Sequence, residues 1–260
     1  MSNKPNYLFR AKTNEGFLFK VLTEILVTNI KTCCFLLNSE SISLRMTDNL
    51  KKVLIDLKLE SDKFQIYKFE MDQKKMIGLN LTHLYKMLKS VKKKDTVELF
   101  IDDQNINDFG IRVIPKDNSR VTTSFIKIQN IQNISINLPD KYKNSHIINS
   151  SDYQKMIKDM LNIGNIINIK STMNTITFNC IADGIYSKQV EFGAYEDEDN
   201  EILYEDNFYL EQLHKLIKIS GLNNKIYVYT SKDQPLFIKC LIGSLGTICI
   251  YIKSINQLNL

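Results

Sequence analysis

The stretch Gly78–Leu88 reads GLNLTHLYKML and begins a pattern that predicts an amphipathic helix. Asn80 is a favoured residue at a helix N-terminus, because its side-chain oxygen can accept a hydrogen bond from a free backbone N–H of the first turn. Apolar residues then recur at helical spacing and share one stripe: Leu81, Leu84, Leu88 and Val91. The opposite sector carries Lys86, Lys89 and Lys93, so we predict that the apolar stripe packs on a core and the lysines face outward.

The sequence on both sides of this helix predicts two halves with the same order of elements. In the first half we predict a helix over 15–27, the helix that begins at Asn80, and strands at 7–11, 32–37, 41–46, 53–59, 96–101, 109–114 and 121–128. In the second half we predict a helix capped by Ser151, a helix over about 207–220 that Gly221 closes, and strands at 166–170, 175–181, 189–194, 225–230, 236–242 and 247–252. This shared order indicates an internal duplication.

The segment between the two halves predicts a connector. Residues 129–143 are polar, contain Pro139 and show no sustained period, which is typical of a loop. We therefore expect an N-terminal domain over 1–128, a connector over 129–143 and a C-terminal domain over 144–260.

The composition describes an ordinary globular protein. Its 260 residues are 43% hydrophobic and 24% charged, and the net charge is +5. We find no apolar run of the about 20 residues that a spanning helix needs and no secretory leader, so we expect a protein that is neither membrane-bound nor secreted. No CxxC pair occurs, and we expect reduced thiols with neither disulfides nor zinc at the five cysteines: Cys33, Cys34, Cys180, Cys240 and Cys249.

Lysines also mark the outward faces of the other predicted helices. The third and fourth helices each carry a lysine pair opposite the apolar stripe: Lys155 with Lys158, and Lys215 with Lys218. An AT-rich coding genome would account for the number of lysines but not for their helical phase. Lysine contacts phosphates as a point charge without fixing a register, so these faces favour a polyanion such as duplex DNA. On the first helix Lys20 shares its outward face with Thr23 and Glu24, so we expect it to contribute less.

Several strings in the same order along the chain resemble the proliferating cell nuclear antigen family of DNA sliding clamps. They are EGFLFKVLTEIL (15–26), SISLRMTDNLKKVLIDLKL (41–59), GLNLTHLYKML (78–88), the helix and closing glycine over 151–164, and PLFIKCLIGSLGTICIYIK (235–253). The resemblance implies an α+β fold of two similar DNA-clamp domains, with outer antiparallel β-sheets and four inner helices that line a ring, usually of three subunits.

The resemblance implies a function without catalysis or cofactor. A clamp of this kind is a processivity factor that encircles double-stranded DNA, regardless of its sequence, during replication and repair. The implied partners are a DNA polymerase, a clamp loader and other proteins with clamp-binding peptides. The implied place is the nucleus, or a cytoplasmic viral factory if the genome is that of a large DNA virus.

The resemblance also assigns two protein-binding surfaces. It implies that edge strands near 120–128 and 186–192 pair head to tail between neighbouring subunits, with contacts from Val121, Thr123, Phe125, Tyr186, Lys188 and Val190. It implies an apolar pocket for partner peptides at Thr47, Lys51, Leu54, Leu138, Pro139, Pro235, Tyr251 and Ile252. Thr47 and Lys253 depart from the small or apolar residues common in the family, so the preferred peptide motif stays open. The first helix also lacks most of the family's basic residues, with Phe19 where a lysine is common.

Other function classes find less support in the sequence. His83, His146 and His214 form no catalytic motif, and the nine glycines form no phosphate loop. We interpret the acidic segment 196–206 as a solvated loop rather than a metal site, because it lacks EF-hand spacing. Trp is absent and the lysine faces carry few aromatic residues, which disfavours a single-strand binding protein. A viral processivity factor that does not encircle DNA and a subunit of a heterotrimeric checkpoint clamp remain as alternatives.

Overall fold

The computed structural model describes residues 6–132, 135–140, 142, 144–182, 184–193 and 201–259. The chain divides into two units. The first comprises residues 1–46, 56–135 and 241–248, and the second comprises residues 47–55, 136–240 and 249–260. Each unit thus contains most of one half of the chain together with a short piece of the other.

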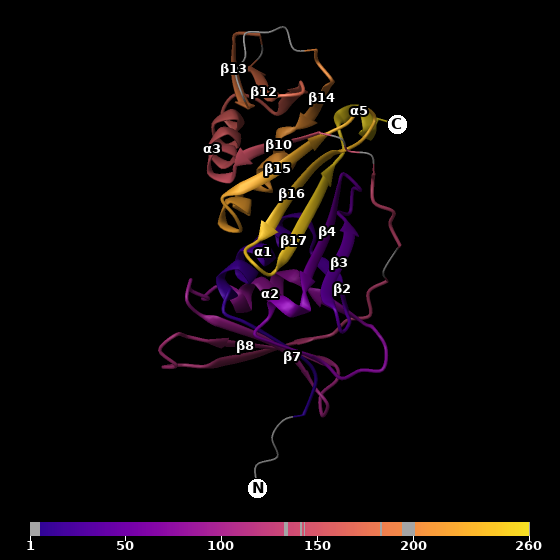
Figure 1. The fold of residues 1–260 in the computed structure, drawn as a ribbon, viewed down its shortest axis with the longest axis vertical. Coiled ribbons are helices and arrows are strands. Elements are labelled where there is room, and N and C mark those ends of the chain that lie inside the picture. The colour runs from indigo at the N-terminus through magenta and orange to yellow at the C-terminus, as the bar shows by residue number, and fades with distance from the viewer. Residues whose placement is uncertain are drawn as a thin grey trace. The chain divides into compact units, whose positions relative to one another are not determined.

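The first unit holds two antiparallel sheets and two helices. Its elements in chain order are β1 (Tyr7–Thr13), α1 (Gly16–Asn29), β2 (Thr32–Leu37), β3 (Ser41–Thr47), β4 (Val53–Glu60), the 3₁₀ turn η1 (Ser61–Lys63), β5 (Ile66–Phe69), β6 (Lys75–Asn80), α2 (Leu81–Leu88), β7 (Thr96–Asp102), β8 (Asp108–Ile114) and β9 (Thr122–Lys127). One sheet has the order β5-β1-β7-β8-β9, and β4, β3, β2 and β6 are neighbours in the other. Figure 1 shows α1 and α2 next to each other beside β7 and β8.

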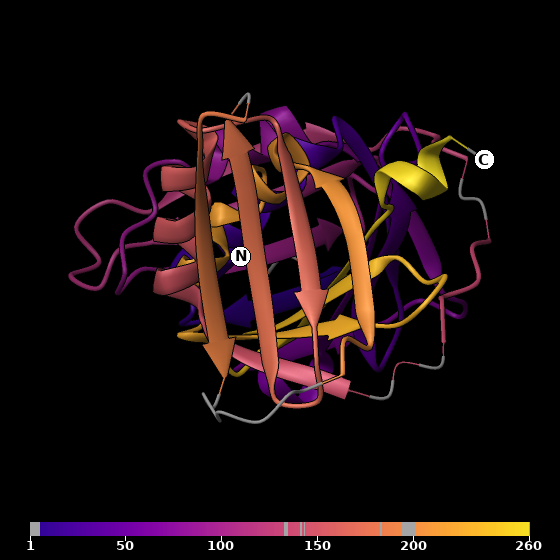
Figure 2. The same cartoon turned by 90° about the horizontal axis from the view of Figure 1, so that it is seen from above.

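The second unit repeats this plan. Its elements are β10 (Asn144–Asn149), α3 (Ser150–Leu161), β11 (Ile166–Ser171), β12 (Thr175–Ala182), β13 (Tyr186–Gly193), β14 (Tyr204–Tyr209), α4 (Leu210–His214), the 3₁₀ turn η2 (Ile217–Gly221), β15 (Lys225–Thr230), β16 (Leu236–Ile242), β17 (Gly246–Ile252) and α5 (Ile255–Leu258). Four strands form a sheet of order β13-β12-β11-β14, seen side by side in Figure 2. Strands β10, β15, β16 and β17 follow one another in the second sheet.

The predicted duplication is confirmed at the level of strand pairing. In both units a strand precedes the first helix and pairs with the strand that follows the second helix: β1 pairs with β7, and β10 pairs with β15. The strand that leaves the first helix pairs with the strand that enters the second, so β2 pairs with β6 and β11 with β14. The α+β clamp fold expected from the sequence is therefore present in both halves.

Each core lies where the two helices meet the sheets. In the first unit Phe19 of α1, Leu84 of α2, Leu99 of β7 and Phe35 of β2 converge on one point. In the second unit the fully buried Tyr153 of α3 donates its hydroxyl proton to the Leu213 carbonyl oxygen at 3.1 Å, which ties α3 to α4. Burying these side chains removes apolar surface from water and holds the helices in place.

The buried cysteines belong to the same cores. Cys33, Cys34, Cys180 and Cys240 are buried, and Cys249 is half-buried. Burial raises the pKa of the Cys240 thiol to about 12, so this thiol stays protonated at neutral pH and packs as a small apolar group.

The end of α2 differs from the sequence prediction. The Asn80 cap is confirmed, because its Oδ1 accepts a hydrogen bond from the His83 N–H at 3.1 Å. The helix ends at Leu88, however, so Val91 and Lys93 lie beyond it. The reason is Asp95, whose Oδ2 accepts from the Lys92 N–H at 2.9 Å and closes a turn in place of further helix.

The predicted fourth helix is also wrong in part. Residues 207–209 belong to β14, which pairs with β11. Glu205 and Asp206, from the acidic segment that we interpreted as a loop, lie in the same strand, and residues 196–200 of that segment lie outside the described residues. The rest of the segment is α4 followed by η2. Its fully buried residues recur every third position, at Leu210, Leu213, Leu216 and Ile219. That period of three suits a 3₁₀ turn, whereas the predicted helix over about 207–220 would bury residues at α-helical spacing.

The remaining differences are short elements. The sequence prediction missed β5, β6, β10, β14, η1 and α5. The third helix begins at Ser150 and its N-cap residue is Asn149, so Ser151 does not cap it. Ser150 instead donates its hydroxyl proton to the Asn223 carbonyl oxygen, which anchors the start of α3 to the chain before β15.

Candidate functional site

The lysines predicted to face DNA in the first unit fall into two groups. Lys86 on α2 and Lys89 at its end are exposed. Lys93 is exposed as well, but it lies in the loop after α2 rather than on the helix. Lys20 is half-buried, and its ammonium donates to the Val91 carbonyl oxygen at 3.2 Å. Lys20 is therefore held against the end of α2, and its neighbour Thr23 is buried rather than outward.

The lysines of the second unit occupy similar helical positions. Lys155 and Lys158 are exposed on α3, opposite the buried Ile157 and Met160. Lys215 caps the end of α4 and forms an ion pair with Glu211 at 3.1 Å. Lys218 is exposed in η2. The two lysines thus lie on separate short elements, not on one continuous helix as predicted.

The segments predicted to join subunits are edge strands. In the strand orders of the described residues, β9 ends one sheet and β13 ends another. Val121, just before β9, is 50% exposed, and Phe125 on β9 is 54% exposed. Tyr186 on β13 is 54% exposed. Thr123 is exposed, and Lys188 and Val190 are half-buried. Exposed apolar side chains on an unpaired edge are a liability that proteins normally cover, so both strands are suited to pair with another chain.

An ion pair fixes one of these edges. Lys188 on β13 contacts Asp159 on α3, with 2.8 Å between Nζ and Oδ2. Hydrogen bonding to Lys188 holds the pKa of Asp159 below its usual value, so the carboxylate stays ionised at neutral pH. The contact connects the edge strand to the helix that carries Lys155 and Lys158.

The residues predicted for the peptide pocket all lie in the second unit. Pro235 and Tyr251 come together around Tyr142, whose hydroxyl donates to the Pro235 carbonyl oxygen at 2.7 Å and whose ring centroid lies 6.3 Å from that of Tyr251. Leu138 and Pro139 are half-buried and Lys51 is exposed in the turn after β3. Thr47 and Pro235 are half-buried as well, and three of the predicted residues are buried: Ile252 at 0%, Tyr251 at 6% and Leu54 at 9%.

An aromatic cluster that the sequence did not indicate surrounds Tyr251. Phe237 on β16 stacks on Tyr251 with ring centroids 4.6 Å apart, and on its other side it stacks on Tyr229 at 4.6 Å. The Tyr142 ring is tilted against that of Phe237, with the two centroids 5.2 Å apart. Burial raises the pKa of Tyr142, so its hydroxyl remains a donor to Pro235 at neutral pH. The sequence did hold a signal for this cluster. Each of the three predicted strands β15, β16 and β17 carries an aromatic residue: Tyr229, Phe237 and Tyr251.

The described residues contain no cluster of metal-binding groups. Among them, no group of three or more His, Cys, Asp or Glu residues lies close enough to hold a metal ion. His83, His146 and His214 lie on α2, β10 and α4. None of the described helices is long and apolar enough to cross a membrane.

Comparisons with known proteins decide the family. The model of the proliferating cell nuclear antigen N-terminal domain matches residues 8–136, and the model of the C-terminal domain matches residues 137–255. The chain belongs to the proliferating cell nuclear antigen family. Clamps of this family are non-enzymatic scaffolds that bind DNA and polymerase partners, and they act on DNA in the nucleus or at sites of viral replication.

Individual clamps align over nearly the full chain. A probable DNA polymerase sliding clamp 1 of Paramecium bursaria Chlorella virus 1 is 25% identical and covers 96% of this chain and 98% of its own. The proliferating cell nuclear antigen of Chaetomium thermophilum is 20% identical over 94% of this chain and 97% of its own. The crystal structure of the Entamoeba histolytica clamp superposes with a TM-score of 0.83 at 21% identity, covering 96% of this chain and 99% of that one.

Proposed function

We propose that this chain is a subunit of a DNA sliding clamp, a homotrimeric ring that encircles duplex DNA and tethers a polymerase and other DNA enzymes. The observation that carries the proposal is that each of the two family domains ends its sheet in an exposed edge strand, β9 in one and β13 in the other. A contact between two different edges is head to tail, and such contacts close into a ring when the rotation suits. The exposed lysines of α2 and α3 would face the phosphates.

The proposal assigns the protein no catalytic step. It acts by topology, because a closed ring cannot leave a circular duplex without opening an interface. Its place is where DNA is copied, in a nucleus or at a site of viral replication, and its partners are the polymerase and the loader found there.

The decisive test compares circular with linear DNA. We expect that clamp loaded onto a nicked circle stays bound when salt is raised, and slides off once the circle is linearised. Phosphate contacts alone weaken steeply with salt, by about 10³-fold or more between 50 and 200 mM for roughly six contacts, whereas a topological link does not. The measurement is gel filtration of the loaded complex before and after cleavage. If the protein were lost equally from circular and linear DNA, the ring mechanism would be wrong. A processivity factor that does not encircle DNA would then be favoured.

The subunit arrangement is tested separately by mass. Light scattering of the pure protein should give one species at three times the 30.2 kDa chain mass. Phe125→Asp on β9 and Tyr186→Asp on β13 should each give monomers, because a buried carboxylate without a partner is costly. A mixture of the two variants should form dimers, since each chain keeps the edge that the other lacks. An interface of two identical edges predicts no such rescue, and a monomeric parent protein would exclude the homotrimer.

A further inference from the structure

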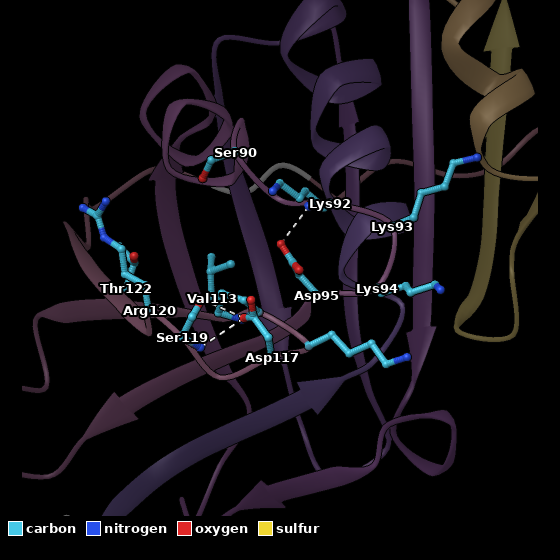
Figure 3. A pocket seen from close by; sticks show the side chains of 12 residues that line it. Ser90, Lys92, Lys93, Lys94, Asp95, Val113, Asp117, Ser119, Arg120 and Thr122 are labelled. Atoms are coloured by element: carbon cyan, nitrogen blue, oxygen red, sulfur yellow. Dashed lines mark hydrogen bonds between the residues drawn. The ribbon is translucent and has the colours of Figure 1, made fainter.

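A basic cleft lies in the first unit between the loop that joins α2 to β7 and the turn that joins β8 to β9 (Figure 3). We call it the basic cleft and define it by its five cations, Lys92, Lys93, Lys94, Lys116 and Arg120. Its volume is about 990 Å³. A second cavity of about 540 Å³ shares Lys93, Lys94 and Lys116 and adds Lys12 from β1. Residues far apart in sequence are thus gathered around one concave, positively charged surface.

Both walls of the cleft are tight turns whose carboxylates are already engaged. On one wall the Asp95 N–H donates to the Lys92 carbonyl oxygen at 3.1 Å, and the Asp95 carboxylate accepts from the Lys92 N–H. On the other wall the Asp117 carboxylate accepts from the Ser119 N–H at 3.0 Å and from its hydroxyl at 2.7 Å. The two carboxylates shape the walls, and five cations against two carboxylates leave the cleft with a surplus of positive charge.

The cations of the cleft outnumber its two carboxylates, Asp95 and Asp117. None of the five takes part in an ion pair among the described residues, although all five are exposed. Hydrogen bonds from Ser119 lower the pKa of Asp117, and the charge of Lys92, which lines the same cleft, lowers it further. Like charges gathered without partners repel one another, so an anionic ligand would relieve the repulsion.

The arrangement of the cations suits an extended anion. In Figure 3 the side chains of Lys93 and Lys94 extend to one side of the cleft, and Arg120 lies on the opposite side. Charges that are spread in this way match successive phosphates along a strand better than a single small ion. None of the twelve described residues that line the cleft is aromatic, so the cleft offers no platform on which a base could stack.

We propose that the basic cleft binds the sugar–phosphate backbone of the DNA that the clamp holds, as an extension of the lysine face of α2. This proposal rests on the clamp function proposed above and adds Lys92, Lys94 and Lys116 to the lysines assigned from helical phase. Arg120 begins the edge segment proposed for the subunit contact and is not assigned to DNA. Continuity supports the proposal, because exposed Lys86 and Lys89 lead along the chain directly into Lys92–Lys94.

The test removes the charges of the cleft and compares them with equal charges elsewhere. The cleft variant carries Lys→Gln at 92, 93, 94 and 116, and the control variant carries Lys→Gln at 58, 68, 74 and 75, which are exposed lysines of the same unit. Affinity for a short linear duplex is measured by fluorescence anisotropy between 50 and 200 mM salt. The plot of the logarithm of the association constant against the logarithm of the salt concentration has a negative slope. In the cleft variant the magnitude of this slope should fall by about 2 to 4, because each lost phosphate contact lowers it by about 0.9. The control should change it by less than about 1.

Two further variants make every outcome decisive. A variant with Lys→Arg at the four cleft positions keeps the charges and should keep the slope, which separates lost charge from altered folding. A helix variant with Lys→Gln at 86, 89, 155 and 158 reports on the clamp function itself. If the cleft variant behaves like the control while the helix variant loses slope, the cleft proposal fails and the clamp stands. If neither variant loses slope and the protein leaves circles and lines equally, the clamp function fails. Unchanged DNA slopes with lost binding of an acidic loader peptide would overturn the cleft proposal in favour of protein docking.

Discussion

Replacing Glu98 with alanine is expected to destabilise the first unit by about 3 kcal/mol, because it leaves two arginines without their shared counter-charge. Glu98 on β7 is 1% exposed. Its Oε1 lies 2.5 Å from Nε of Arg10 on β1, and its Oε2 lies 2.5 Å from Nη1 of Arg112 on β8. Arg112 stands directly opposite Glu98 in the strand register. The carboxylate therefore links three adjacent strands, and cross-strand pairs of this kind stabilise a sheet.

The arginines set the expected size of this effect. Their side chains are 28% and 26% exposed, so water can take over part of the lost interaction, and the cost falls at the lower end of the range for a broken buried pair. Aromatic rings hold both guanidinium groups in place, with Arg10 5.2 Å from the Tyr7 ring and Arg112 4.9 Å from the Phe100 ring. In Glu98→Ala the two arginines thus stay close to the position that the carboxylate occupied.

Asp56→Ala is the matched control for Glu98→Ala. Asp56 pairs with Arg45 at 2.7 Å, but the two side chains are 23% and 44% exposed, so this change should cost no more than about 1 kcal/mol. Urea unfolding of the two variants and the parent protein gives both free energies. Equal shifts of the two midpoints would show that Glu98 contributes no more than a surface pair.

Strands were predicted well where burial alternates or apolar runs are long. The sequence placed β2, β15 and β16 at their observed bounds, because their β-branched and apolar residues leave no competing helical period. β14 could not be predicted in the same way. Its letters YEDNFY bury only Tyr204 and Phe208, and pairing with β11 outweighs the preference of its acidic residues for a loop.

The candidate DNA-facing lysines could be located from the sequence only where a helix repeats. Helical phase identified Lys86 and Lys155 because one stripe of each helix is buried. Helical phase could not predict the basic cleft, because Lys92 and Lys116 line it from two turns that are far apart in sequence. Glu98 likewise gave no signal, because a charged residue within a strand does not reveal which neighbours will face it.

Tyr142 offers the sharpest test of the partner pocket, which we propose lies around it. Tyr251, the aromatic residue expected from the resemblance, is 6% exposed and stacked on Phe237, so truncating it would also damage the core. Tyr142 is half-buried, and its ring lies against Phe237 and Tyr251. It also follows Leu138 and Pro139 in the predicted connector. A half-exposed aromatic ring on a firm aromatic base is the kind of group that anchors a peptide.

Tyr142→Ala is therefore expected to lower the affinity of the polymerase for the clamp by about 30-fold, which corresponds to about 2 kcal/mol for the loss of an aromatic anchor. Tyr142→Phe keeps the ring and loses only the hydrogen bond to the Pro235 carbonyl oxygen, so its effect should stay within about fivefold, since one neutral hydrogen bond contributes about 1 kcal/mol. The measurement is primer extension on circular DNA by the polymerase of the same genome. The concentration of each loaded clamp variant is titrated, and the concentration that gives half of the full stimulation reports the affinity. Light scattering on the same samples must show the mass of the parent protein. The aromatic side chain of Tyr142 contacts residues of β15, β16 and β17, so its loss should leave the edge strands β9 and β13 intact. If Tyr142→Ala rings stimulated the polymerase as the parent does, the pocket would have to lie elsewhere.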